Sequence, residues 1–323
     1  MTAAIAVHGG AGGADQPEVP GGARADYTEV PGGAREERRR ALAAARDAGV
    51  AILAGGGSAI DAVTEAVCLL EDAPLFNAGT GSVLTWDGTI EMDASVMADR
   101  EAFGGVGAIR AVRHPVRVAR AVMEETDHWI LAGEGALAFA RSHAWGGPWD
   151  PERPERRARW RALRDEVLRA ARASDRPADP ALARRDRLVS YVKAHPIVAG
   201  TPGTVGAVAI DRAGRAAAAT STGGVWLKLT GRVGDSALPG AGTFVGPGGA
   251  VSATGHGEAI LRVQLARRAE SLLRTMDAPA AAALAIEEAT AAGCDAGLIA
   301  VDRRGGIGAA FNTAAMPAES GRV

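Results

Sequence analysis

Thr204 directly follows Gly203 and begins the apolar run from Val205 to Ile210. A threonine hydroxyl is a weak nucleophile inside a chain, but cleavage of the Gly203–Thr204 bond would free an α-amine on the same residue. An α-amine has an unperturbed pKa near ~8, so it can accept the hydroxyl proton at neutral pH. Gly203 has no Cβ and can take up the backbone geometry that such a cleavage requires. The pair therefore predicts a self-activating nucleophile, although taken alone these residues are more typical of an ordinary buried strand.

Three further clusters place hydroxyls or charges among glycines at the ends of predicted strands, where backbone N–H groups can turn inward. They are TSTGG from Thr220, GRVGDS from Gly231, and the run from Ser252 to Glu258. An acyl-transfer site needs a nucleophile, a base, oxyanion donors and a clamp for a charged substrate. The three clusters can supply the donors and the clamp that Thr204 lacks.

Thr254, with the N–H of Gly255, could hold an oxyanion, and Arg232 with Asp235 could hold the carboxylate and ammonium of an amino acid. Arg232 and Asp235 could equally form a surface ion pair at i, i+3. His256 could act as a base, but a histidine between glycines is more often a scaffold residue. The other histidines show no metal-ligand spacing, and the glycine-rich start has neither a GK[ST] nor a GxGxxG pattern for nucleotides.

The composition points to a folded protein that acts on small molecules. The chain has 323 residues, 47% of them apolar, a net charge of −2 and 4% aromatic residues, which argues against a nucleic-acid partner. Its two cysteines form no disulfide framework, which favours a reducing cytoplasm. No signal peptide or membrane span is predicted.

The elements that must position these groups alternate between helices and short strands. Helical patterns cover Glu36 to Leu53, Ser58 to Leu70 with a capping box, Pro115 to Glu125, Gly133 to Ser142, Glu258 to Thr275 and Ala278 to Ala292. Hairpins are expected around Asp87-Gly88, Asp211 to Arg215, and Asp302 to Gly306, which indicates a largely antiparallel sheet.

Two segments stand apart from this pattern. The motif EVPGGAR occurs at Glu18 to Arg24 and again at Glu29 to Arg35, and predicts a surface loop. From about residue 145 the chain becomes rich in arginine, proline and acidic residues, which predicts a solvated helix within a mobile connector over about 145–203. A long connector that ends at Thr204 suits a precursor that is cleaved there.

Together these motifs resemble the plant-type asparaginases, or isoaspartyl peptidases, of the N-terminal nucleophile hydrolase superfamily. The match rests on HGGAG, LEDAPLFNAGTG, DASVM, GTVGAVAID, TSTGG, GRVGDS and TGHGE, in that order. The resemblance implies one α+β domain over residues 1–323, a four-layer αββα sandwich. It also implies an α subunit of residues 1–203 and a β subunit of residues 204–323 after autocleavage.

By position, the resemblance implies a role for each site residue. Thr204 is the expected nucleophile, Thr222 tunes it, Thr254 and Gly255 stabilise the oxyanion, and Asn77 supports the nucleophile. Arg232 is expected to bind the substrate α-carboxylate, and Asp235, assisted by Gly257, the α-ammonium. A structural sodium is expected on the backbone carbonyls of Leu70, Glu71, Ala73, Phe76, Ala78 and Thr80. The resemblance implies no organic cofactor and a dimer of αβ units.

The expected reaction is hydrolysis of L-asparagine and isoaspartyl dipeptides with release of L-aspartate. Two alternatives stay open: a glycosylasparaginase-like hydrolase, and an uncleaved relative that acts by binding or assembly. Leu227 and Thr230 replace the asparagine and proline common in the family, and Trp226 adds bulk at the expected pocket mouth. These departures, the EVPGGAR insertion and His256 leave substrate preference open.

Overall fold

The computed structural model describes residues 2–12, 32–151, 153–173 and 203–323. Its strands are β1 Ala4–His8, β2 Met92–Ala98, β3 Ala102–Ile109, β4 Ile130–Ala132, β5 Val205–Ile210, β6 Ala216–Thr222, β7 Thr243–Gly246, β8 Gly249–Gly255, β9 Ala296–Asp302, β10 Ile307–Phe311 and β11 Ala318–Arg322. Its α-helices are α1 Gly32–Ala54, α2 Ala59–Asp72, α3 Pro115–Glu125, α4 Gly133–Ser142, α5 Pro154–Ala173, α7 Gly257–Val263, α8 Leu265–Leu273 and α9 Ala278–Ala291. Short 3₁₀ turns cover Gly79–Gly81 and Asp235–Ala237.

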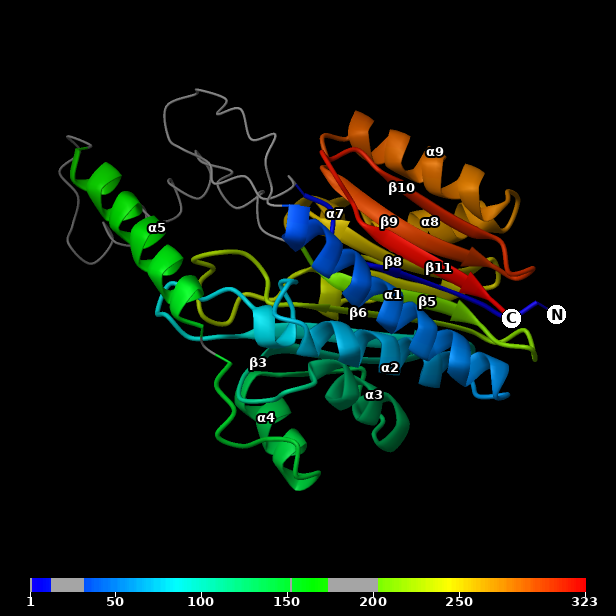
Figure 1. The fold of residues 1–323 in the computed structure, drawn as a ribbon, viewed down its shortest axis with the longest axis horizontal. Helices are drawn as coiled ribbons and strands as arrows, with labels where there is room; N and C mark the ends of the chain where they lie inside the picture. The colour runs from blue at the N-terminus through cyan, green and yellow to red at the C-terminus, as the bar shows by residue number, and fades with distance from the viewer. Residues whose placement is uncertain (1, 13–31, 152, 174–202) are drawn as a thin grey trace.

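Within the described residues the strands form two stacked sheets. One has the order β11-β1-β5-β6-β2-β3-β4 and the other β10-β9-β8-β7. The pairs are antiparallel except for β3 with β4. Helices α1, α2 and α3 cover the outer face of the larger sheet, and α8 and α9 cover that of the smaller one (Figure 1). This arrangement confirms the predicted α+β fold with αββα layers.

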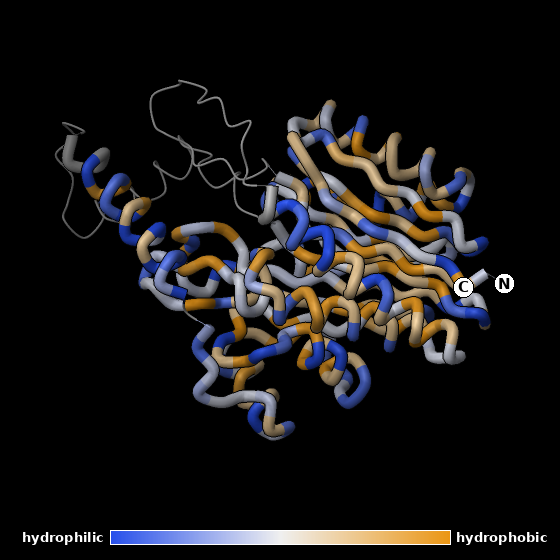
Figure 2. Tube along the Cα trace, in the orientation of Figure 1, coloured by the Kyte–Doolittle hydropathy of each residue, from blue (hydrophilic) through white to orange (hydrophobic). Residues whose placement is uncertain are grey.

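Strand alternation explains why both faces of the larger sheet are buried. Along β5, Ala207 and Ala209 face the helices, while Val208 and Ile210 pack between the two sheets. A second apolar layer lies between the smaller sheet and α8 and α9. Figure 2 shows hydrophobic residues along the strands at the centre of the molecule. Successive side chains of a strand point to opposite faces of the sheet, so a strand such as β5 contributes to two apolar layers.

The helix predictions hold where the sequence carries a start signal. Ser58 and Asp61 form the predicted capping box of α2, and Pro115 occupies the first turn of α3, which has the predicted bounds. The single helix predicted from Glu258 to Thr275 is wrong: α7 ends at Val263 and α8 begins at Leu265. Gln264 separates them with a left-handed backbone, φ 51°.

Two of the three predicted hairpins are confirmed, and they share one turn chemistry. Asp211 Oδ1 accepts hydrogen bonds from the backbone N–H groups of Ala213 (2.9 Å) and Arg215 (3.0 Å), and Asp302 accepts equivalent ones from Arg304 and Gly306, each 2.8 Å. The third hairpin is reduced to a turn at Asp87-Gly88 closed by one bridge between Leu84 and Ile90.

The expected connector is partly described. Its predicted helix is α5, but the expectation of a solvated helix holds for one face only, because Leu163 and Val167 are buried. The first EVPGGAR copy lies outside the described residues. The second extends into α1, which begins at Gly32, so the loop expected up to Arg35 ends earlier. None of the described helices is long and apolar enough to cross a membrane.

Candidate active site

Thr204 lies at the start of β5 with 8% of its surface exposed. Strands β5 and β6 pair Val205 with Ser221, so the same register places Thr204 opposite Thr222. Residues directly opposite on antiparallel strands have Cβ atoms about 4.5–5.5 Å apart. The Thr222 hydroxyl accepts a hydrogen bond from the Gly224 N–H at 3.0 Å, which fixes its position. The fold therefore brings the expected nucleophile and its expected tuning hydroxyl together.

Thr254 reaches the same point from the opposite sheet. It is fully buried at the end of β8, and its Oγ1 accepts a hydrogen bond from the Ala11 N–H at 3.1 Å. A Cβ placed on Gly203 would lie 3.1 Å from this Oγ1 and 2.9 Å from Gly10 Cα. Gly255, the next residue, has φ 141°, a conformation that favours glycine. The hydroxyl of Thr254, one of the two expected oxyanion residues, thus lies against Gly203 at the expected scissile peptide.

Arg232, Asp235 and Gly257 meet at a second point of the site. A Cβ on Gly257 would lie 2.7 Å from both Arg232 Nη2 and Asp235 Oδ1, so only glycine lets the two charges converge there. Arg232 is also paired with Glu258 at 3.0 Å. Asp235 is 5% exposed, so Arg232 and Asp235 are not the exposed surface pair that was the alternative, and we call the two residues the clamp.

Asp235 has a buried carboxylate oxygen to which a cationic group could bind. Its Oδ2 is buried and has no hydrogen-bond partner among the described residues. Burial raises the pKa of Asp235 to about 7, although Arg232 acts in the opposite direction. An orphaned buried carboxylate oxygen beside a guanidinium fits the zwitterionic end of an amino acid, because an ammonium group would give it the missing donor.

Comparisons with known proteins show the family of this chain. The model of the asparaginase family matches residues 1–321. The chain belongs to the asparaginase family. It is 46% identical over 266 residues to a plant-type L-asparaginase from Pyrococcus abyssi, covering 80% of this chain and 82% of the relative.

Two relatives carry a second activity in their names. An isoaspartyl peptidase from Salmonella typhimurium is 39% identical over 319 residues, which span 97% of this chain and 93% of the relative. An isoaspartyl peptidase/L-asparaginase from Rattus norvegicus is 41% identical over 283 residues, or 85% and 78% of the two chains. The resemblance read from the motifs is confirmed along nearly the whole chain.

Asn77 holds the backbone of this asparaginase-family site. Its Nδ2 donates to the Gly224 carbonyl at 2.6 Å, its Oδ1 accepts from the Val83 N–H at 3.0 Å, and its own carbonyl accepts from the Gly223 N–H at 2.8 Å. Asn77 thus fixes the turn that follows Thr222. The contacts of its side chain place it behind the site as a support.

Three buried charged residues at the same site were missed by sequence reasoning. Glu91 Oε2 accepts from the Gly231 N–H at 2.7 Å, and Asp93 Oδ2 accepts from the Gly234 N–H at 2.9 Å. Lys228 Nζ donates to the Glu91 carbonyl at 2.7 Å, and burial lowers the pKa of this lysine. Asp93 lies in the DASVM motif, so the signal was present. All three hold the loop that carries Arg232.

A chain of buried hydroxyls crosses between the two sheets and was also missed. His8 Nε2 lies 2.9 Å from Ser252 Oγ, which contacts Thr220 Oγ1 at 2.8 Å. Thr243 Oγ1 donates to Thr220 at 2.6 Å, and Ser95 Oγ lies 2.8 Å from Thr243. Burial lowers the pKa of His8 to about 3, against a smaller opposite effect of the Thr204 backbone. His8 is therefore neutral and belongs to the scaffold beneath Thr204.

The structure corrects the expectation for Trp226 and supports the favoured interpretation of His256. Trp226 was expected at the pocket mouth, but it is 4% exposed and packs with Val83 and Leu84 beneath α5. His256 caps α7 with an exposed side chain, 3.8 Å from Glu258, and its N–H bonds the Asp295 carbonyl at 2.9 Å. These contacts favour the scaffold interpretation of His256.

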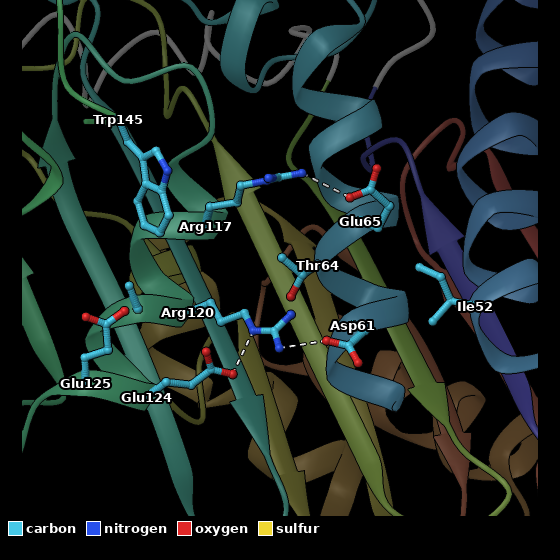
Figure 3. Close-up of a pocket in the computed structure, with 10 residues that line it drawn as sticks. Ile52, Asp61, Thr64, Glu65, Arg117, Arg120, Glu124, Glu125 and Trp145 are labelled. Carbon is cyan, nitrogen blue, oxygen red and sulfur yellow. Dashed lines mark hydrogen bonds and ion pairs between the residues drawn. The ribbon is translucent and has the colours of Figure 1, made fainter. Parts of the chain in front are cut away.

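A pocket of about 330 Å³ between α2 and α3 contains none of the predicted site residues (Figure 3). Its charges already satisfy one another: Arg117 pairs with Glu65 at 3.1 Å, and Arg120 pairs with Asp61 at 2.7 Å and Glu124 at 2.8 Å. Because it holds neither the expected nucleophile nor the Arg232–Asp235 clamp, we do not assign the pocket as the substrate site.

The structure does bring one histidine to possible metal ligands, which sequence spacing did not indicate. Cys68, Glu71 and His114 offer ligand atoms within 4.8 Å of one another. However, Arg117 Nε donates to Cys68 Sγ at 3.2 Å, and Glu71 Oε1 accepts from Ser221 Oγ at 2.6 Å. A guanidinium against the thiol disfavours a cation, so the arrangement favours a hydrogen-bonded cluster behind β6.

Proposed function

We propose that this protein is an autoprocessing amidohydrolase in which Thr204 first cleaves its own chain and then hydrolyses L-asparagine and isoaspartyl dipeptides. The observation that carries the proposal is the meeting of two sets of groups. Thr222 lies opposite Thr204 in the strand register and Thr254 lies against Gly203, while the arginine–aspartate clamp meets Gly257, three residues after Thr254. The first set suits acyl transfer, and the second suits a free α-amino acid end.

In the processing step, Thr204 Oγ attacks the Gly203 carbonyl carbon, the peptide C–N bond breaks, and the hydroxyl proton passes to the departing nitrogen, which leaves an ester and a neutral α-amine. The Thr254 hydroxyl, which lies against Gly203, supports the negative oxygen of the intermediate together with the Gly255 N–H. Water then hydrolyses the ester and leaves Thr204 with a free amine.

In the substrate reaction, Arg232 binds the α-carboxylate and Asp235 the α-ammonium, and this directs the side-chain carbonyl to Thr204. The hydroxyl proton passes to the α-amine as Oγ attacks, and then from that amine to the departing ammonia or amine. Water hydrolyses the resulting ester and releases L-aspartate. The relatives' names, L-asparaginase and isoaspartyl peptidase, support both substrates.

The test compares wild-type protein with Thr204→Ala on L-asparagine and a β-aspartyl dipeptide, with aspartate release as the readout. Wild type should divide into two chains and turn over both substrates, whereas Thr204→Ala should stay whole and inactive. Thr204→Ser is the matched control, because it keeps a hydroxyl and should retain part of both activities. A whole, active Thr204→Ala protein would overturn the proposal.

We also propose that the turn after α2 holds a structural sodium on the carbonyls of Leu70, Glu71, Ala73, Phe76, Ala78 and Thr80. Carbonyl oxygens are the ligands that hard cations prefer. The Glu71 and Phe76 carbonyls lie against Gly79 and Gly81, where side chains would displace them. Sodium bound there would fix the segment that leads to Asn77. Replacing sodium by tetramethylammonium should lower the thermal midpoint if the ion is structural.

Assembly as a dimer of αβ units in the cytoplasm completes the proposal. Cys68 and Cys294 are both free and buried, which suits a reducing compartment. Trp129 and Ile130, 50% and 37% exposed at the edge strand β4, are apolar groups that an interface could cover. Light scattering on the processed protein distinguishes a dimer from a single αβ unit.

A further inference from the structure

Helix α5 docks on a defined apolar seat, which consists of Val83, Leu84, Trp226 and Leu227. Leu163 and Val167, spaced i, i+4 on one face of α5, are 7% and 2% exposed and pack on this seat. Trp226 and Leu227 are two of the residues that depart from the family pattern. Their bulk is therefore used to hold a helix, and Figure 1 shows that helix at the edge of the sandwich.

Polar contacts extend the docking to the Asp87-Gly88 turn. Trp160 Nε1 donates to the Thr85 carbonyl at 2.8 Å, and Arg157 Nη2 donates to the Gly88 carbonyl at 3.0 Å. A Cβ on Gly88 would lie 3.0 Å from Trp160 Cζ2, so the indole rests directly on the turn. The Arg164 guanidinium lies 5.2 Å from the centre of the same indole.

The Asp87-Gly88 turn also contacts the loop of residues 223–231, which runs between the site residues Thr222 and Arg232. The Leu227 N–H donates to the Leu84 carbonyl at 3.0 Å, and the Trp86 N–H donates to the Lys228 carbonyl at 2.8 Å. Thr230 Oγ1 donates to Asp87 Oδ2 at 2.5 Å. Residues 84–88 are thus held on one side by α5 and on the other by the loop before the substrate clamp.

We propose that α5 is an intramolecular support that fixes the position of Arg232, with Trp160 as its principal positioning residue. The proposal rests on the function proposed above. Trp160 touches neither substrate nor nucleophile; it acts by limiting the motion of residues 84–88 and hence of the loop. Since Arg232 binds the α-carboxylate, loosening the loop weakens substrate binding more than it changes the reaction at Thr204. After cleavage, the packing of Leu163 and Val167 with Trp226 and Leu227 joins α5 to the β subunit, whereas Trp160 and Arg157 contact the α subunit.

The test is Trp160→Ala, assayed on fully processed protein with L-asparagine. We expect KM to rise about five- to tenfold while kcat changes by less than about twofold, because the lost interaction acts on binding. Arg161→Ala is the matched control, since Arg161 is exposed on the same helix. Trp160→Phe keeps an aromatic ring but loses the bond to Thr85, and should recover part of the KM.

A general loss of stability is separated from positioning by Leu273→Ala, a truncation in the layer between the smaller sheet and α8. It should lower the thermal midpoint at least as much as Trp160→Ala and leave KM unchanged. If Trp160→Ala does not fold, Leu163→Ala applies the same test from the buried face of α5. If the wild-type protein shows no turnover, the proposed function is refuted. If the wild-type protein is active and the folded α5 variant has an unchanged KM, the proposed role of α5 as a support for Arg232 is refuted.

Discussion

The carboxylate of Glu91 accepts a hydrogen bond from the backbone N–H of Gly231 at 2.7 Å, one residue before Arg232, the residue proposed to bind the substrate α-carboxylate. Glu91 is 1% exposed, and its other oxygen lies 3.3 Å from Arg110 Nε. A buried carboxylate with charged and backbone donors is a strong anchor, because leaving the N–H unpaired would cost free energy. The position of the Arg232–Asp235 clamp is therefore set by the residue that precedes β2, 140 positions earlier in the chain than Gly231.

Glu91→Gln keeps an acceptor for the Gly231 N–H but removes the charge that pairs with Arg110. We expect KM for L-asparagine to rise about threefold to tenfold with a smaller change in kcat, since the loop would be held less firmly. Glu287→Gln, on the exposed face of α9, is the control and should leave both constants unchanged. The measurement is KM and kcat for L-asparagine at fixed pH. Equal values in wild type and Glu91→Gln would show that Glu91 does not fix the position of Arg232.

Asp235 should make binding and stability respond to pH in opposite directions. Its pKa in the folded protein is about 7, raised by burial above the ordinary value of 3.8. The ionised form that binds an ammonium increases as pH rises from 6 to 8, so the Kd of L-aspartate should fall by roughly tenfold per unit below about pH 7. Calorimetry with this product measures binding without the chemical step.

The stability of the unliganded protein follows the reverse sign. A carboxyl whose folded pKa is raised contributes stability that is present below about pH 4 and lost as pH rises through about 7. Asparagine does not ionise, so Asp235→Asn should not lose stability in this way as pH rises. The thermal midpoint of the variant should therefore exceed that of wild type by more at pH 8 than at pH 5. An equal difference at both pH values would contradict the raised pKa.

Gly257→Ala should damage the clamp by geometry alone. The added Cβ would lie 2.7 Å from Arg232 Nη2 and Asp235 Oδ1 and would force them apart. We expect kcat/KM to fall at least about tenfold while cleavage at Thr204 proceeds, because the clamp is not needed for processing. Gly135→Ala is the control, since a Cβ there meets nothing within 4 Å. Wild-type kinetics in Gly257→Ala would place substrate elsewhere.

Ser252→Ala tests the hydroxyl chain between the sheets. The change removes the partner of the buried His8 Nε2 and one of the partners of Thr220, which costs about 1–3 kcal/mol of unfolding free energy. Thermal or urea unfolding should show this loss, and Ser320→Ala, exposed on β11, should not. A stability equal to wild type would mean that the chain is not a structural link.

The sequence could predict the elements whose ends carry local signals. Pro115 fixes the start of α3, the Ser58 capping box fixes that of α2, and the aspartates Asp211 and Asp302 fix two hairpins, because each acts on residues within four positions. The break at Gln264 had no such signal, since a left-handed conformation is usually marked by glycine.

The candidate site was found through its motifs, while its supports were not. Thr204, Thr222, Thr254, Arg232 and Asp235 stand out because hydroxyls and charges among glycines are unusual. The contacts that hold them depend on long-range packing: His8 and Ser252 are 244 positions apart, and Glu91 and Gly231 are 140 apart. Trp226 was misplaced for the same reason, because only the fold shows that α5 covers it.

The most direct test of the central claim is the intact mass of the purified protein over several days at neutral pH, with N-terminal sequencing of any fragment. The account predicts two chains, one of which begins at Thr204, and aspartate release from L-asparagine that increases with the fraction cleaved. A protein that stays a single chain of 32.8 kDa and still hydrolyses L-asparagine would contradict Thr204 as the nucleophile.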